Sequence, residues 1–229
     1  MNGRFLVPNT VTAANIVCGF LSMLAAAAGR FEFAVYLLLA AILLDMSDGV
    51  LARKLRATSR FGLELDSFSD SLSFCAAPAF LAQHALLQPL GPFGTVASVT
   101  YLLAGVLRLA RFNVTSNEHE KAEHTTGVPT PIGAGYVMVL VLMRNEIPAV
   151  VSALVIFAVA LLMVSRLQLP EWRRGGLVTR AMLLGVANYF AIVIWPNWYT
   201  VGWWTLWNIV ILIVDRRASS DQPLEPSTS

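Results

Sequence analysis

Charged residues are scarce in this chain of 229 residues, because Asp, Glu, Lys and Arg together make up 13% of it, against roughly 25% in a soluble domain. Hydrophobic residues make up 56%, and the formal net charge is +2 with no basic tail. The shortage of charge argues against a soluble globular protein, and the near balance of charge argues against a nucleic-acid partner. The two cysteines, Cys18 and Cys75, both lie in apolar segments, which favours buried free thiols over a disulfide or a metal site.

Long apolar segments recur along the chain. Most of them approach the ~20 residues that a helix needs to cross a bilayer. We expect spans at 11–28, 33–52, 67–88, 93–112, 130–143, 147–165, 178–195 and 199–214. The fifth, PIGAGYVMVLVLM, is short and rich in glycine, so its boundaries are the least defined. The sequence therefore predicts an all-α, polytopic transmembrane helix bundle of about eight spans, with six to eight compatible with the pattern. We expect one membrane domain over 1–214 and a polar, disordered tail over 215–229.

The basic residues predict how the bundle is oriented. If the N-terminus is cytoplasmic and eight spans alternate, 14 of the 16 Lys and Arg residues lie on the cytoplasmic side, and Arg30 and Arg144 lie outside. Cytoplasmic loops of membrane proteins are rich in Lys and Arg, so we expect both termini in the cytoplasm. The small residues of LAAAAG also fit a signal-peptide cleavage site, but the apolar run before them is longer than a typical signal peptide has.

Four aspartates stand out against this apolar background, in the stretch DMSDGVLARKLRATSRFGLELDSFSD at 45–70. Asp45 and Asp48 end the second expected span with a spacing of three residues, and Asp66 and Asp70 open the third with a spacing of four. Each pair therefore occupies one face of its helix. Two neighbouring antiparallel helices would then present four carboxylates to one point near the cytoplasmic boundary.

Four carboxylates so close together repel one another unless a cation neutralises them. Carboxylate oxygens suit Mg²⁺ or Mn²⁺, and four of them can bridge two ions. The small residues Gly49, Ala52 and Gly62 leave room for a ligand beside the cluster. Two metal ions next to several arginines suit phosphoryl transfer. The plainer alternative is a set of interfacial charges partly neutralised by Arg53 or Arg60.

The fixed residues and gaps of this stretch resemble the complete signature of the CDP-alcohol phosphotransferases. They read Asp45-x2-Asp48-Gly49-x2-Ala52-Arg53-x8-Gly62-x3-Asp66-x3-Asp70. Members of that family are membrane enzymes that move a substituted phosphate from a CDP-linked donor to an alcohol and release CMP. The resemblance implies that the same residue positions have the same roles here.

The implied roles concern metal binding, proton transfer and the nucleotide. Asp45, Asp48 and Asp66 would bind one ion, and Asp45, Asp66 and Asp70 the other. Asp70 would also be the general base for the attacking hydroxyl. The residues implied to line the CDP pocket are Gly49, Ala52, Arg53 and Gly62.

Within the family, further stretches resemble the bacterial phosphatidylserine synthases. They are VPNTVTAANIVCGFLSML, ELDSFSDSLSFCAAPA, RLARFNV, GVPTPIGAG and MVSRLQLP. The implied donor is CDP-diacylglycerol, the implied acceptor is L-serine, and the implied form is a homodimer in a bacterial or archaeal cytoplasmic membrane with its active site at the cytoplasmic face. Ser69 and Cys75 depart from the small residues that are more usual at those positions, without affecting the chemistry.

Candidates for binding the acceptor or a phosphate follow on the same expected side. Arg108 and Arg111 are spaced by three residues and can face one point, where arginine suits a carboxylate or a phosphate. Asn113 and Thr130 are weaker candidates. The alternative for the arginines is that they anchor the fourth span at the lipid headgroups.

Other interpretations stay open at this stage. Another acceptor of the same family, such as glycerol 3-phosphate or inositol phosphate, fits the metal cluster equally well. A cation transporter would place its carboxylates near the middle of the membrane, whereas these lie at span ends. The segment NEHEKAEHTTG, with His119, Glu120, Glu123 and His124, lacks the spacing of a helical zinc motif and fits a polar flap better.

Overall fold

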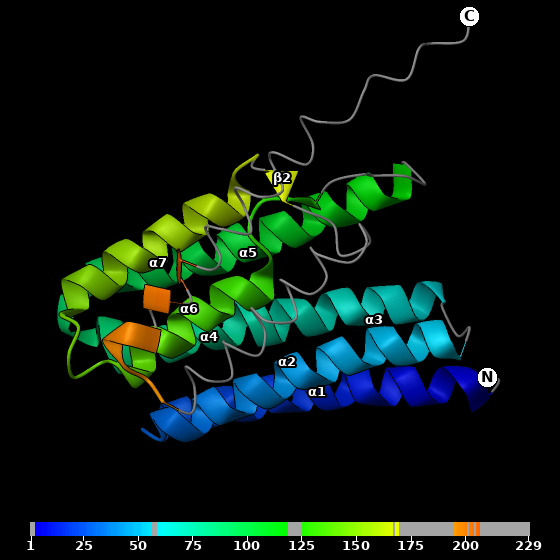
Figure 1. Cartoon of the computed structure of the whole chain (residues 1–229), viewed down its shortest axis with the longest axis horizontal. Coiled ribbons are helices and arrows are strands. Elements are labelled where there is room, and N and C mark those ends of the chain that lie inside the picture. The colour runs from blue at the N-terminus through cyan, green and yellow to red at the C-terminus, as the bar shows by residue number, and fades with distance from the viewer. Residues whose placement is uncertain are drawn as a thin grey trace, which may run out of the picture.

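A computed structural model describes residues 3–55, 59–118, 125–166, 168–169, 195–200, 202–203 and 205–206 (Figure 1). The described part is helical apart from one short antiparallel pair of two-residue strands, β1 (Thr125–Thr126) and β2 (Gln168–Leu169). The predicted all-α bundle is therefore confirmed over these residues. The expected spans at 178–195 and 199–214 lie wholly or largely outside them, as do the tail and the segment 119–124.

The first two helices form a long antiparallel hairpin, α1 (Gly3–Ala27) and α2 (Phe31–Lys54). Gly29 makes the turn at a positive φ of 73°, which glycine adopts without steric penalty. The buried residues of α2 recur with helical spacing as Ala34, Val35, Leu38, Ala41 and Ile42. Because several of them are small, α1 and α2 pack closely along their length.

The third expected span is part of a longer helical run that begins at Arg60, before the expected start at 67. Its parts are α3 (Arg60–Asp70), the π-helical η1 (Ser71–Ala76), α4 (Ala77–Ala82), the π-helical η2 (Gln83–Leu87) and the 3₁₀ turn η3 (Gln88–Leu90). The run starts early because Ser59 caps it, accepting a hydrogen bond from the Gly62 N–H at 3.0 Å.

The π-helical turn η1 follows directly after Asp70, and a proline lies just beyond it. Pro78 has no N–H to donate to the carbonyl four residues earlier, which belongs to Phe74. The buried Tyr101 hydroxyl donates to that carbonyl at 3.1 Å instead. The widened turn is thus fixed by a tertiary contact that the local sequence does not predict.

The remaining described helices are α5 (Pro92–Glu118), α6 (Thr130–Leu142) and α7 (Ala149–Val164). Most of α6 is buried, and it packs against α2, α4 and α7. Its glycines permit this close packing, since a Cβ on Gly133 would collide with the Met163 side chain. The short, glycine-rich fifth segment is therefore an interior helix.

Within the described residues, three helices are long and apolar enough to cross a membrane, namely Leu6–Ala27, Phe31–Ala52 and Pro92–Val114. The helices α6 and α7 are apolar but shorter. Large exposed side chains on the long helices are apolar, such as Phe20, Leu24, Tyr36 and Leu103. Such a surface fits a membrane protein, whose helices face lipid.

The bundle has two chemically different ends (Figure 1). The N-terminus of α1, the C-termini of α2 and α5, and the start of α3 lie at one end, here called the carboxylate end. The turns around Gly29, Gly91 and Arg144 lie at the other, here called the turn end. Among the described residues, the basic side chains near the carboxylate end include Lys54, Arg60, Arg108 and Arg111, and those near the turn end are Arg30 and Arg144.

Candidate active site

The carboxylates of α2 and α3 meet at the carboxylate end. Single oxygen atoms of Asp45, Asp48 and Asp66 all lie within 4.8 Å of one another. Asp48 is buried, with 6% of its surface exposed, and the other two are half-buried. The spacing of three residues on α2 places Asp45 and Asp48 on one face, and α1 packs against both α2 and α3, so the two acidic faces share one site.

Asp70 completes the cluster one turn further along α3. Its carboxyl group lies within hydrogen-bonding reach of that of Asp45 and interacts electrostatically with Asp66 and Arg108. Its Oδ1 atom is buried and has no hydrogen-bond partner in the part of the chain that the structure describes. The structure thus brings all four aspartates together, as the spacing predicts.

The helix α1 adds a residue that the sequence did not single out. Thr12 is buried, and its hydroxyl donates to Asp48 Oδ2 at 2.8 Å. The same hydroxyl lies 3.1 Å from the Pro8 carbonyl oxygen, its alternative acceptor. A hydrogen bond from a neighbouring helix orients a carboxylate and fixes which oxygen is available to a ligand. The only sequence signal was a polar residue, Thr12, within the apolar first span.

Serine side chains join α1 to the helix that carries Asp66 and Asp70. Ser69 Oγ donates to the Thr12 carbonyl oxygen at 3.4 Å, and Ser73 Oγ donates to the Asn15 carbonyl oxygen at 3.1 Å. A Cβ on Gly19 would lie 2.9 Å from Ser73 Cα, so only glycine permits this approach. These contacts hold α1 in a fixed register beside the cluster.

The small residues of the signature lie around the same site. Gly49 and Ala52 are half-buried on α2, and Gly62 lies in the first turn of α3. A Cβ on Gly62 would lie 3.2 Å from Ser59 Oγ and 3.3 Å from Asn9 Oδ1, so this wall is already tight. Arg53 belongs to α2, but its side chain lies outside what the structure describes.

The two candidate arginines of α5 have different surroundings. Arg108 is buried, with 7% exposed, next to Asp70, and its Nε atom has no hydrogen-bond partner among the described residues. Arg111 donates to the carbonyl oxygens of Val164 at 2.9 Å and Ser165 at 3.1 Å, at the C-terminus of α7. Cationic groups stabilise helix C-termini, so Arg111 has a structural contact that Arg108 lacks.

The other two acceptor candidates also differ. Asn113 Nδ2 donates to Ser67 Oγ at 3.0 Å, which ties α5 to α3. Thr130 is fully buried at the start of α6, and its hydroxyl has no partner in the described part of the chain. Gly105, one turn before Arg108, lies against both Cys75 and Thr130. Thr130 is therefore close to the Arg108 side of the site.

The donor set fits a divalent metal ion. Carboxylate oxygens are the preferred ligands of hard cations, and four carboxylates would otherwise repel one another in a poorly solvated place. The buried Asp70 Oδ1 atom has no hydrogen-bond partner in the described part of the chain, and a bound cation would be coordinated by it.

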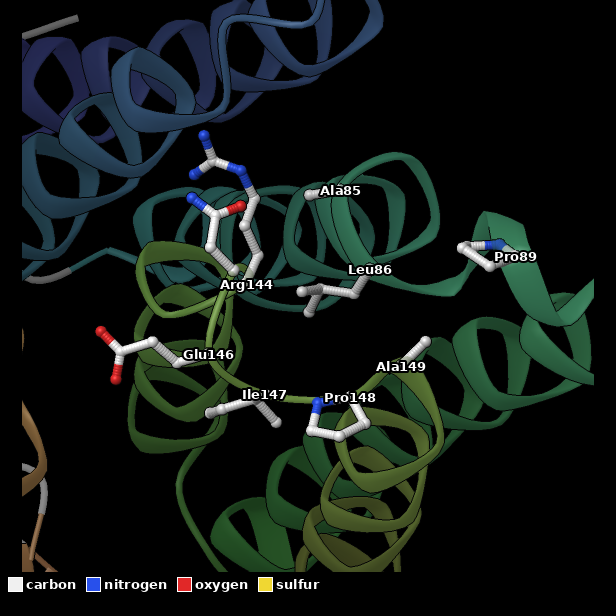
Figure 2. A pocket seen from close by; sticks show the side chains of 9 residues that line it. Ala85, Leu86, Pro89, Arg144, Glu146, Ile147, Pro148 and Ala149 are labelled. Carbon is white, nitrogen blue, oxygen red and sulfur yellow. The ribbon is translucent and has the colours of Figure 1, made fainter.

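The described cavity does not coincide with the carboxylate cluster. A cavity of about 420 Å³ opens at the turn end, between the Ala85–Pro89 turn and the connection from α6 to α7 (Figure 2). Figure 2 shows Glu146 pointing away from that cavity, and Arg144 binds Glu32 at 2.6 Å. The cavity lacks the convergent unpaired charges of the carboxylate end.

Similarity to known proteins agrees with this geometry. The family model of the CDP-alcohol phosphatidyltransferases matches residues 5–165. A CDP-diacylglycerol–serine O-phosphatidyltransferase of Helicobacter pylori is 32% identical over 182 residues, covering 76% of this chain and 76% of that protein. One of Bacillus subtilis is 33% identical over 168 residues, covering 73% of this chain and 92% of that protein.

An archaeal relative is similar to the same extent. The archaetidylserine synthase of Methanothermobacter thermautotrophicus is 33% identical over 172 residues, covering 72% of this chain and 70% of that protein. The region that the family model matches, residues 5–165, covers α1 from residue 5 and the described helices from α2 to α7, and with them the four aspartates and Thr12. The chain belongs to the CDP-alcohol phosphatidyltransferase family.

Proposed function

We propose that this protein transfers the phosphatidyl group from CDP-diacylglycerol to the hydroxyl of L-serine, giving phosphatidylserine and CMP. The observation that carries the proposal is the convergence of four carboxylates from α2 and α3 with Arg108 beside Asp70. The names of the similar bacterial and archaeal proteins share serine and differ in the lipid. They therefore support the acceptor more specifically than the lipid chains of the donor.

Asp70 is the proposed general base. The serine oxygen attacks the phosphorus atom that bears the diacylglycerol, the bond from that phosphorus to the CMP oxygen breaks, and the hydroxyl proton passes to Asp70. A carboxylate within hydrogen-bond reach can take that proton as the new bond forms. Asp70 suits this role because one of its oxygens has no hydrogen-bond partner among the described residues while Arg108 lies close by.

All four aspartates, Asp70 included, would hold metal. Asp45, Asp48 and Asp66 would bind one Mg²⁺ or Mn²⁺, and Asp45, Asp66 and Asp70 a second. Such ions, when bound, would neutralise the diphosphate and the developing charge on the leaving CMP. Thr12 would keep Asp48 in place for this task.

Substrate contacts are assigned by what surrounds each residue. We assign the serine carboxylate to Arg108, with Thr130 nearby, because both are buried and keep a polar atom without a partner in the described residues. Arg111 and Asn113 would act indirectly, through α7 and α3. Gly49, Ala52, Arg53 and Gly62 would line the pocket for the cytidine diphosphate. We further propose a homodimer, which the family resemblance implies. We also propose that the site lies at the cytoplasmic face, which the basic residues of the carboxylate end support.

The test is CMP release from the purified, detergent-solubilised protein, given CDP-diacylglycerol, Mg²⁺ or Mn²⁺, and one alcohol at a time. We expect release with L-serine and none with glycerol 3-phosphate or inositol phosphate. Release with one of those alcohols alone would overturn the serine assignment and keep the metal site. Absence of release with every alcohol would overturn the donor as well.

A further inference from the structure

Asn15 lies on α1, one helical turn beyond Thr12. It is fully buried, with 0% exposed, yet both the nitrogen and the oxygen of its amide lack a hydrogen-bond partner within the described part of the chain. Leaving a buried amide unsatisfied costs free energy, and most buried polar groups are paired. A bound ligand that hydrogen-bonds to the amide would explain this exception.

Along the axis of the bundle, Asn15 lies at a height similar to that of the catalytic candidate Asp70. The helices α1 and α3 both run from the carboxylate end towards the turn end. Ser69 contacts the Thr12 carbonyl and Ser73 contacts the Asn15 carbonyl, and Asp70 lies between these two serines in the chain. Asn15 is therefore level with Asp70, about 4.5 Å further along α1 than the residue that binds Asp48.

The position of Asn15 is fixed by its helix. The hydrogen bonds from Ser69 and Ser73 set the register of α1, and the contact of Gly19 with Ser73 sets its distance from η1. A helix held in this way does not turn to bring the amide to another partner. The amide therefore stays without a hydrogen-bond partner among the described residues unless a ligand supplies one.

We propose that Asn15 binds the polar end of the acceptor alcohol and selects a zwitterionic acceptor over a phosphorylated one. This inference rests on the proposed function and adds a specificity residue to it. The carbonyl oxygen of a neutral amide can accept a hydrogen bond from the ammonium group of an amino acid, and its N–H groups can donate to the carboxylate that Arg108 also binds. A phosphorylated acceptor would require a cation at this place instead.

The experiment replaces Asn15 with leucine, which has a similar size and no hydrogen-bonding groups. CMP release is measured while serine is varied at saturating CDP-diacylglycerol, and then with the two reversed. We expect the KM for serine to rise about tenfold, as for the loss of a hydrogen bond to a charged group. The KM for CDP-diacylglycerol should stay unchanged, and thermal stability should be kept or raised, because an unsatisfied buried amide has been removed.

The matched control is Ser22→Ala. Ser22 is also buried on α1, but it donates to the Ala34 carbonyl oxygen near the turn end, so its loss should lower stability without changing the KM for serine. An unchanged KM for serine in Asn15→Leu overturns the proposal, and so does a rise in the KM for CDP-diacylglycerol alone. If the leucine variant does not fold, Asn15→Ala gives the same reading.

A failure of the proposed serine activity can be distinguished from a failure of the proposed Asn15 contact. If the wild-type protein releases CMP with another alcohol and not with serine, the serine assignment and the preference for a zwitterion both fail. The contact of Asn15 with the acceptor is then read from the KM for that alcohol, and an unchanged value overturns it.

Discussion

Charged side chains are paired at one end of the bundle and incompletely paired at the other. At the turn end, Arg144 binds Glu32 at 2.6 Å and lies over the Phe31 ring, 5.5 Å from its centroid, so this charge is used to join helices. At the carboxylate end, the half-buried Asp70 lies beside the buried Arg108, and each has one buried atom without a hydrogen-bond partner in the described residues. Paired charges hold a fold together, whereas buried charges left incompletely paired indicate a place for a ligand.

The cavity and the candidate catalytic residues lie at different ends of the bundle. The cavity of about 420 Å³ belongs to the turn end (Figure 2), while the carboxylate cluster is at the opposite end. The exposed Trp195, Trp198 and Trp203 lie around the outer turn expected between the spans 178–195 and 199–214, where tryptophan is typical of a membrane interface. The turn end therefore has the features of a structural and interfacial region.

The largest effect is expected from Asp70→Asn, which removes the proposed base and keeps the side-chain size. Loss of a general base typically lowers turnover by about 10²–10⁴-fold, so kcat for CMP release should fall by that order. Metal binding, measured by calorimetry, should largely persist, because Asp45, Asp48 and Asp66 remain. The matched control at the turn end is Glu32→Gln, which should leave kcat unchanged. A kcat for Asp70→Asn close to that of the wild type would show that another group takes the proton.

The second effect is expected from Arg108→Ala. Removing a charged hydrogen-bond donor from a serine carboxylate should raise the KM for serine by about 10–100-fold, the equivalent of roughly 1.5–3 kcal/mol. Arg144→Ala breaks an ion pair that is partly exposed and should alter stability by about 0–1 kcal/mol with no change in KM. Titrating serine in both variants checks this, and equal KM values in the two would contradict the assignment of Arg108.

The smallest effect is expected from Thr12→Val, which keeps the shape of the side chain and removes its hydroxyl. Asp48 then loses its 2.8 Å hydrogen bond, and metal affinity should fall about tenfold, the lower end for loss of a group that orients a metal ligand. Direct titration with Mn²⁺ measures this without reference to turnover. Thr10→Val is the control, because the exposed Thr10 hydroxyl contacts only the Leu6 carbonyl among the described residues. Equal Mn²⁺ affinities in the two variants would show that Thr12 does not support the site.

The sequence by itself determined the class of the protein and the central part of its site. Low charge and long apolar segments require helices whose backbone groups are satisfied within each span, and the spacing of Asp45, Asp48, Asp66 and Asp70 places each pair on one helix face. Both conclusions depend on local geometry, which a periodic pattern encodes. The family signature lies in the same 26-residue stretch at 45–70.

Only the tertiary structure decided which side chains meet across helices. In the structure, Thr12 donates to Asp48, and Arg111 donates to the end of α7 whereas Arg108 lies beside Asp70. Asn15 is buried, and its amide has no partner in the described residues. The tertiary structure also extended the third helix to Arg60 and widened it after Asp70. The physical reason is that these outcomes depend on the distance and register between helices, which are set by contacts such as Gly19 with Ser73, far apart in the chain.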